Sequence, residues 1–139
     1  MDTYWPWSVK KFKIYFMPLP EVRSSNISMH LSREDIVLET AAQIMKDFGL
    51  FGITITFSGD TTNAYFELHN QLVHQIESLI DRDYGRLLSV LYQVDISEKD
   101  IARSAEELPE YNQVELIAHQ IIVRDLKKVL TRHYFKNHK

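Results

Sequence analysis

The fold is decided by the stretch Thr62–Val94, which reads TNAYFELHNQLVHQIESLIDRDYGRLLSVLYQV. Its apolar residues recur at steps of three and four, the spacing of one buried face on a helix. They are Tyr65, Leu68, Leu72, Ile76 and Leu79, then Leu87, Leu88, Leu91 and Val94 after the polar break Asp81-Arg82-Asp83. We therefore expect two amphipathic helices joined by a short hinge, with other segments packed on them.

Helices are also predicted on both sides of this pair. Ser32 followed by two acidic residues is typical of a helix start, and that helix should end at Gly49. Ser97 and Asp100 have the spacing of a capping box and should open a short helix to about Glu107. The last and longest helix is expected from about Asn112 to Tyr134.

The last predicted helix carries more apolar residues than one packed face requires. Leu116, Ile117 and Val123 lie outside its main stripe, which already exceeds the roughly 100° of a single core contact. Either this helix is central in the fold or a partner covers a second side. These three residues are therefore candidates for an interface in a homo-oligomer.

Two segments alternate as half-buried strands do. In Val9–Met17 and again in Gly52–Phe57, apolar residues occupy every second position. Since a lone strand leaves backbone groups unpaired, the two should pair, within one chain or between two. The expected fold is mainly α, a bundle of four to five helices with a small two-stranded β element near the N-terminus. Residues 1–139 form one domain, with an arm and loop at 1–31 and a helical core at 32–139.

The composition is that of an ordinary globular chain, with 139 residues, 45% hydrophobic and a formal charge of −3. Absence of cysteine excludes disulfides and thiolate chemistry. No signal peptide is recognisable and no window approaches the apolar length of a membrane span. We therefore expect a cytoplasmic protein with no membrane partner.

Charge is divided unevenly along the chain. Residues 95–115 hold seven acidic residues against two basic ones, and residues 124–139 hold six basic residues against one acidic. The basic end, with Lys127, Lys128, Arg132 and Lys136, could contact a nucleic-acid backbone. The alternative is that these cations complement the helix dipole and pair with the acidic segment. The second interpretation is favoured because the pI is near 6.0, far below that of a nucleic-acid-binding domain.

Catalytic and metal-binding patterns are weak. Glu115 and His119 share a helical face, but two ligands do not make a metal site. His69 and His74 are five apart and do not face one point. No glycine-rich phosphate loop and no nucleophile elbow occurs. The sequence therefore predicts no metal, no cofactor and no identifiable catalytic residue.

The segments Leu87–Asp100 (LLSVLYQVDISEKD) and Leu116–Phe135 (LIAHQIIVRDLKKVLTRHYF) resemble small helical bacterial proteins of the Bacteroidetes type, a family of unknown function. The shared residues are generic for helices, so the resemblance implies no activity and no site residue. The leading hypothesis is a non-catalytic interaction or structural module that acts as a homo-oligomer. A nucleic-acid-binding protein is the alternative, and an enzyme or small-molecule binder with an unrecognised pocket is the third.

Overall fold

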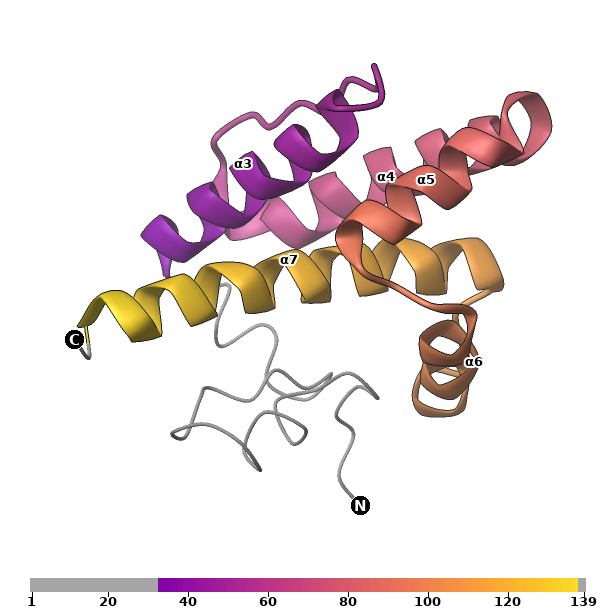
Figure 1. The fold of residues 1–139 in the computed structure, drawn as a ribbon. Helices are drawn as coiled ribbons and strands as arrows, with labels where there is room; N and C mark the ends of the chain where they lie inside the picture. The colour runs from indigo at the N-terminus through magenta and orange to yellow at the C-terminus, as the bar shows by residue number, and fades with distance from the viewer. Residues whose placement is uncertain (1–32, 138–139) are drawn as a thin grey trace.

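The structure is a computed structural model that describes residues 33–137. This part of the chain contains five α-helices and one short 3-10 turn (Figure 1). In chain order they are α3 (Glu34–Gly49), η1 (Thr61–Asn63), α4 (Ala64–Arg82), α5 (Tyr84–Val94), α6 (Glu98–Glu107) and α7 (Gln113–Asn137). The prediction of a mainly helical fold is confirmed.

Helix α7 is the centre of the arrangement, with α3, α4, α5 and α6 all in contact with it. Figure 1 shows α3, α4 and α5 along one side of α7, and α6 near its N-terminal end. Every residue from Leu116 to Val123 is buried. The sequence allowed two explanations for this broad apolar helix, a central position in the fold or cover by a partner. The structure shows the central position. The predicted pair Thr62–Val94 is present as α4 and α5, but it packs on α7 and is not itself the hub.

The hinge between α4 and α5 falls at the expected polar break. The Asp83 side chain accepts a hydrogen bond from the Arg86 amide at 3.1 Å and one from Arg86 Nε at 3.1 Å, which caps α5. The face of α5 differs from the prediction at two residues, Leu88 and Val90. Leu87, Val90, Leu91 and Val94 are buried, but Leu88 is 46% exposed. Its position, one residue after Leu87, turns it toward solvent.

The ends of α6 and α7 are fixed by reciprocal caps. Ser97 and Asp100 form the predicted capping box at the start of α6. At α7, the Asn112 side chain accepts from the Glu115 amide, and the Glu115 carboxylate accepts from the Asn112 amide, both at 2.8 Å. Such caps satisfy amides that the first helical turn leaves without partners.

The predicted strand at Gly52–Phe57 is wrong, because within the described residues Gly52 lies in a turn and residues 53–57 form no strand. Its alternation is real: Ile53 and Ile55 are buried and Thr54 and Thr56 are exposed. A glutamine side chain forms hydrogen bonds to the backbone here, as a partner strand would have done. Gln71 on α4 accepts from the Thr56 amide at 2.9 Å and donates to the Thr56 carbonyl at 2.6 Å. The other predicted strand, Val9–Met17, lies outside the described residues.

Helix α3 ends at Gly49, as expected from the sequence. The left-handed residue that turns the chain is Gly52, with φ 74°, three residues further on. None of the helices in the described range is long and apolar enough to cross a membrane.

Candidate binding groove

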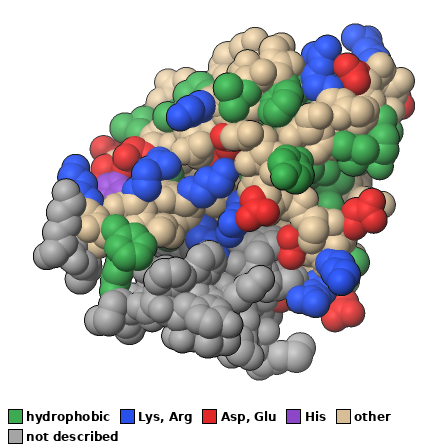
Figure 2. All heavy atoms as spheres, viewed as in Figure 1, with side chains coloured by type: hydrophobic (Ala, Val, Ile, Leu, Met, Phe, Trp, Pro, Cys, Tyr) green, Lys and Arg blue, Asp and Glu red, His purple; other side chains and the backbone are tan. Residues whose placement is uncertain are grey.

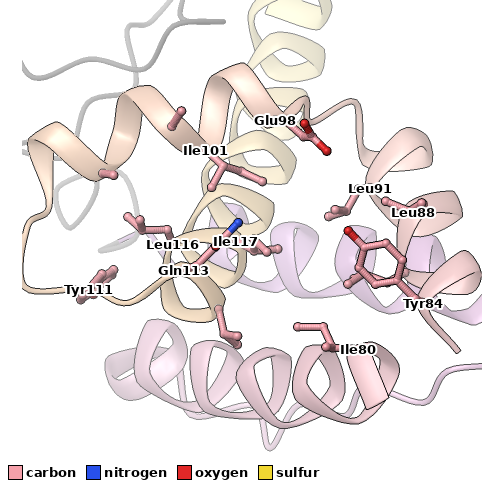
Figure 3. A pocket seen from close by; sticks show the side chains of 14 residues that line it. Ile80, Tyr84, Leu88, Leu91, Glu98, Ile101, Tyr111, Gln113, Leu116 and Ile117 are labelled. Carbon is pink, nitrogen blue, oxygen red and sulfur yellow. The ribbon is translucent and has the colours of Figure 1, made fainter. Parts of the chain in front are cut away.

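A groove of about 640 Å³ opens at the end of the molecule where α6 leaves the bundle (Figure 3). Helices α4, α5, α6 and α7 each contribute to its walls. The described residues that line it are Ile80, Tyr84, Leu87, Leu88, Leu91, Glu98, Ile101, Ala102, Ala105, Tyr111, Gln113, Val114, Leu116 and Ile117. A groove of this size falls within the usual range of about 300–1,000 Å³ for binding sites.

The groove exists because the face of α6 that lines it carries short side chains. Ala102 and Ala105 lie there, so α6 leaves space that larger side chains would have filled. Leu116 and Ile117 of α7 lie at the bottom, only 3% and 5% exposed. The result is a largely apolar trough between short side chains on one wall and branched ones on the other.

Polar groups are few and lie around the apolar lining. Glu98 is the one charged side chain among the described lining residues. In Figure 3 its carboxylate lies on the same side of the groove as the Tyr84 hydroxyl, and the Gln113 amide nitrogen points to the middle. Tyr111 stands at the opposite end. A few convergent polar groups in an apolar setting are typical of a binding site.

The rim of the groove is apolar and accessible to solvent. Ile80, Tyr84 and Leu88 are 41%, 55% and 46% exposed, although each is a large hydrophobic residue. Tyr92, one helical turn beyond Leu88, is 89% exposed. Figure 2 shows hydrophobic side chains on the surface over α5. Exposed apolar residues that adjoin a groove mark an interaction surface more strongly than scattered ones do.

A Tyr–His cluster, formed by Tyr65, His69, Tyr111 and His119, adjoins the groove through Tyr111. The Tyr65 hydroxyl is hydrogen-bonded to His119 Nδ1 and lies 3.1 Å from the Tyr111 hydroxyl. The ring of His69 stacks on that of Tyr65 with centroids 5.4 Å apart, and its Nε2 lies 3.1 Å from the Glu115 carbonyl oxygen. The cluster therefore ties α4 to the start of α7.

Burial governs protonation in this cluster. It lowers the pKa of His119 to about 3, with a smaller contribution from the neighbouring His69, so the imidazole is neutral at physiological pH. Burial also raises the pKa of the Tyr65 hydroxyl, and the hydrogen bond with Tyr111 acts in the same direction. Tyr65 and His119 are consequently both neutral, and the hydrogen bond between them joins two uncharged groups.

A second buried polar group, the Asp47–Asp125–Lys128 cluster, lies between α3 and α7. The side chains of Asp47 and Asp125 are 2% and 0% exposed, and the Lys128 ammonium lies 3.5 Å and 3.3 Å from their carboxylates. Burial raises the pKa of Asp125 well above its usual value, and the nearby Asp47 adds to this, while Lys128 partly opposes it. The cluster is a charged contact inside the helix interface, away from the groove.

The predicted interface residues fall in two places. Leu116 and Ile117 line the groove, whereas Val123 is fully buried and is not among its lining residues. All three are covered within a single chain, so their apolar character requires no second copy. Oligomeric state stays a prediction.

The predicted nucleic-acid contacts all lie on α7 but differ in their surroundings. Lys127 is buried at 3% exposure, and Lys128 is engaged by Asp47 and Asp125. Arg132 donates to the Gln43 side chain at 2.8 Å, while Lys136 is exposed. Because Lys128, Arg132 and Lys136 follow one another at steps of four on α7, nucleic-acid contact by these residues stays a prediction.

The two pairs considered in the sequence, Glu115 with His119 and His69 with His74, belong to no group of three potential metal ligands in the part of the chain that is described. The Glu115 carboxylate caps α7, and His119 is bonded to Tyr65. His69 and His119, on different helices, are the pair that the fold brings together, and the two spacings considered in the sequence could not reveal it.

Comparison with protein-family models, with curated proteins and with solved structures finds no match to this chain. The resemblance of residues 87–100 and 116–135 to small bacterial helical proteins thus remains an expectation. What can be inferred about function comes from the groove and the two buried polar clusters.

Proposed function

We propose that the protein is a non-catalytic interaction module whose groove binds the apolar face of an amphipathic helix from another protein. The observation that carries this proposal is the continuity of the groove with its exposed rim. Ile80, Tyr84 and Leu88 lead from solvent to the buried Leu116 and Ile117 without an intervening charge. A helix with apolar anchor residues spaced three and four positions apart would cover the exposed rim and the buried floor of the groove at once.

The shape of the groove favours a helix over a compact small molecule. A small ligand would leave Ile80, Tyr84 and Leu88 in water, whereas a helix lying along α5 would bury them. Burial of apolar surface stabilises a complex by roughly 25 cal/mol per Å² before the costs of association are subtracted. The alanines of α6 also permit a close approach, since helices pack at 8–10 Å depending on the side chains at the contact.

Self-association is the competing form of this proposal, because a second copy could present its own α5 to the groove. The two forms differ in measured mass. We expect a monomer at micromolar concentration by light scattering, and a dimer that Leu88→Asp dissociates would identify the partner as a second copy.

Nucleic-acid binding receives no comparable support. A phosphate-binding face needs several free cations, and Lys128 and Arg132 are each engaged within the chain. An enzymatic role is also less favoured, since the Tyr65 hydroxyl and the His119 ring are bonded to each other inside the Tyr–His cluster.

The test uses a fluorescent, uncharged amphipathic peptide of leucine, glutamine and alanine, with binding to the full chain followed by anisotropy. Leu88→Asp should weaken binding by about tenfold or more, the loss expected at an interface hot spot. The matched control is Leu38→Asp on α3, because Leu38 is 49% exposed and Leu88 is 46% exposed. Equal effects of the two variants, or no binding by the unmodified protein, would refute the groove as the site.

A further inference from the structure

We infer that the helix bound by the groove is basic, with a lysine or arginine that pairs with Glu98. This inference rests on the proposed function and adds the chemistry of the partner. Glu98 is the one charged side chain among the described residues lining the groove. A bound helix that covered it without supplying a cation would have to remove a carboxylate from water without compensation, which is costly.

Glu98 is available for a partner because its neighbour performs the capping. In the first turn of α6, Asp100 is held by Ser97, with its Oδ2 3.0 Å from both the Ser97 amide nitrogen and the Ser97 hydroxyl. Glu98 makes no hydrogen bond or ion pair with any described residue and is exposed. It therefore keeps its charge at the edge of the groove while the helix start is stabilised by other groups.

The surroundings of Glu98 extend the negative field. Residues 95–115, which form α6 and its flanks, carry seven acidic residues against two basic ones, and of the acidic residues Asp95 is paired with Arg124 at 2.7 Å. At the opposite corner, between α4 and α5, Arg86 is neutralised by Asp83 at 3.1 Å. A basic helix would thus be attracted to the α6 wall, and electrostatic attraction of this kind selects partners and orients them.

The apolar lining beside Glu98 suits a long cationic side chain. Leu91 and Tyr84 line the groove together with Glu98, on the same side of it in Figure 3. The methylene stem of a lysine or arginine can pack on such residues while its charged end reaches a carboxylate. The same arrangement would disfavour an acidic helix, because two carboxylates would meet at the apolar edge.

The experiment compares two 18-residue probe peptides with identical leucine positions, one with lysine and one with glutamate at the polar positions. Each is titrated into the full-length protein at low and at physiological salt. The variant is Glu98→Lys, and the control is Glu34→Lys, which makes the same charge change at the far end of α3 (Figure 1). Circular dichroism establishes that both variants retain their helices.

The unmodified protein should prefer the lysine peptide, and Glu98→Lys should reverse the preference, with about tenfold loss for the lysine peptide. Glu34→Lys should leave the preference in place, and added salt should reduce it. Equal shifts in the two variants would mean that net charge decides, which refutes the inference. In that case the proposed function still holds if Leu88→Asp abolishes binding of both peptides. Binding of neither peptide would refute both proposals.

Discussion

The two halves of α7 meet their neighbours through different chemistry. Its C-terminal half packs on α3 across polar contacts: Asp125 and Lys128 face Asp47, and His133 is paired with Glu39. Its N-terminal half packs on α4, α5 and α6 through apolar residues and the Tyr–His cluster, and there the packing leaves a groove. Of these groups, Asp47 and Asp125 are buried, and Lys128 lies within 3.5 Å of both carboxylates. The N-terminal half of α7 has no such cluster of charged side chains against its described neighbours, and the groove leaves apolar surface accessible there.

The largest effect is expected in the apolar core that both halves share. Leu72 and Ile76 of α4 are completely buried, so truncating either to alanine should lower the free energy of unfolding by about 2–5 kcal/mol. Urea denaturation measures the loss, with Leu38→Ala on the exposed face of α3 as the control. If both core variants lost less than about half a kcal/mol, α4 would not contribute to the core as described.

In the C-terminal half of α7, which packs on α3 through polar contacts, we expect one substitution to increase stability. Replacing Asp125 by asparagine removes a buried charge and leaves Asp47 to pair with Lys128. Stability at neutral pH should rise, because an amide at this buried position avoids the cost of ionising or protonating the carboxyl group that burial imposes on Asp125. A decrease in stability would show that the Asp125 charge is needed to hold α3 against α7.

The pH dependence of that gain follows from the raised pKa of Asp125. The stability linked to the protonated carboxyl is complete below the unfolded pKa of about 3.9 and is lost as pH rises through the folded value. The advantage of Asp125→Asn over the unmodified protein should therefore grow with pH. Taking the difference between the two proteins at each pH cancels the titration of all other groups.

The Tyr–His cluster responds to acid in the opposite way. Because the pKa of His119 is lowered to about 3, folding favours the neutral ring. The stability this confers is present above the unfolded pKa of about 6.5 and falls as pH drops toward 3, by up to about 1.4 kcal/mol per pH unit. The difference between the unmodified protein and His119→Gln should shrink over this range. A pH-independent difference would mean that folding does not shift the pKa of His119.

The smallest effect concerns the hydroxyl that joins this cluster to the groove. Tyr111→Phe keeps the ring and removes the contact with the Tyr65 hydroxyl at 3.1 Å. The expected cost is about 0.5–1.5 kcal/mol, the net contribution of one hydrogen bond. Binding of the uncharged peptide should change little, because the aromatic ring still forms that end of the groove. A large loss of binding would instead make the Tyr111 hydroxyl a contact of the partner.

Helix positions could be predicted from the sequence because their signals are local. The break at Asp81–Asp83, the box at Ser97 and Asp100 and the period of Leu68, Leu72 and Ile76 each depend on neighbours within one or two turns. The strand at Gly52–Phe57 was wrong for a non-local reason. Alternation reports which residues are buried, and it does not report whether a strand or the Gln71 side chain satisfies the backbone.

The groove could not be predicted because it depends on how four helices meet. Its floor includes Leu116 and Ile117, which the sequence singled out only as surplus apolar residues. One overlooked signal was the spacing of Tyr84, Leu88 and Tyr92, which form a second apolar stripe on α5 at steps of four. The Asp47–Asp125–Lys128 cluster had a separate signal in the sequence. Asp47 and Asp125 lie within apolar helix faces, and charged residues at core positions are generally paired.

The central place of α7 has a consequence for synthesis of the chain on the ribosome. Helices α3 to α6 are translated first, yet each of them packs on a helix that follows all of them in sequence. Until residues 113–137 have left the exit tunnel, apolar residues such as Leu72 and Ile76 lack part of their cover. Nascent chains at that stage expose hydrophobic surface, the condition that recruits chaperones and favours aggregation. A translational pause before α7 should therefore be more harmful to this protein than a pause within it.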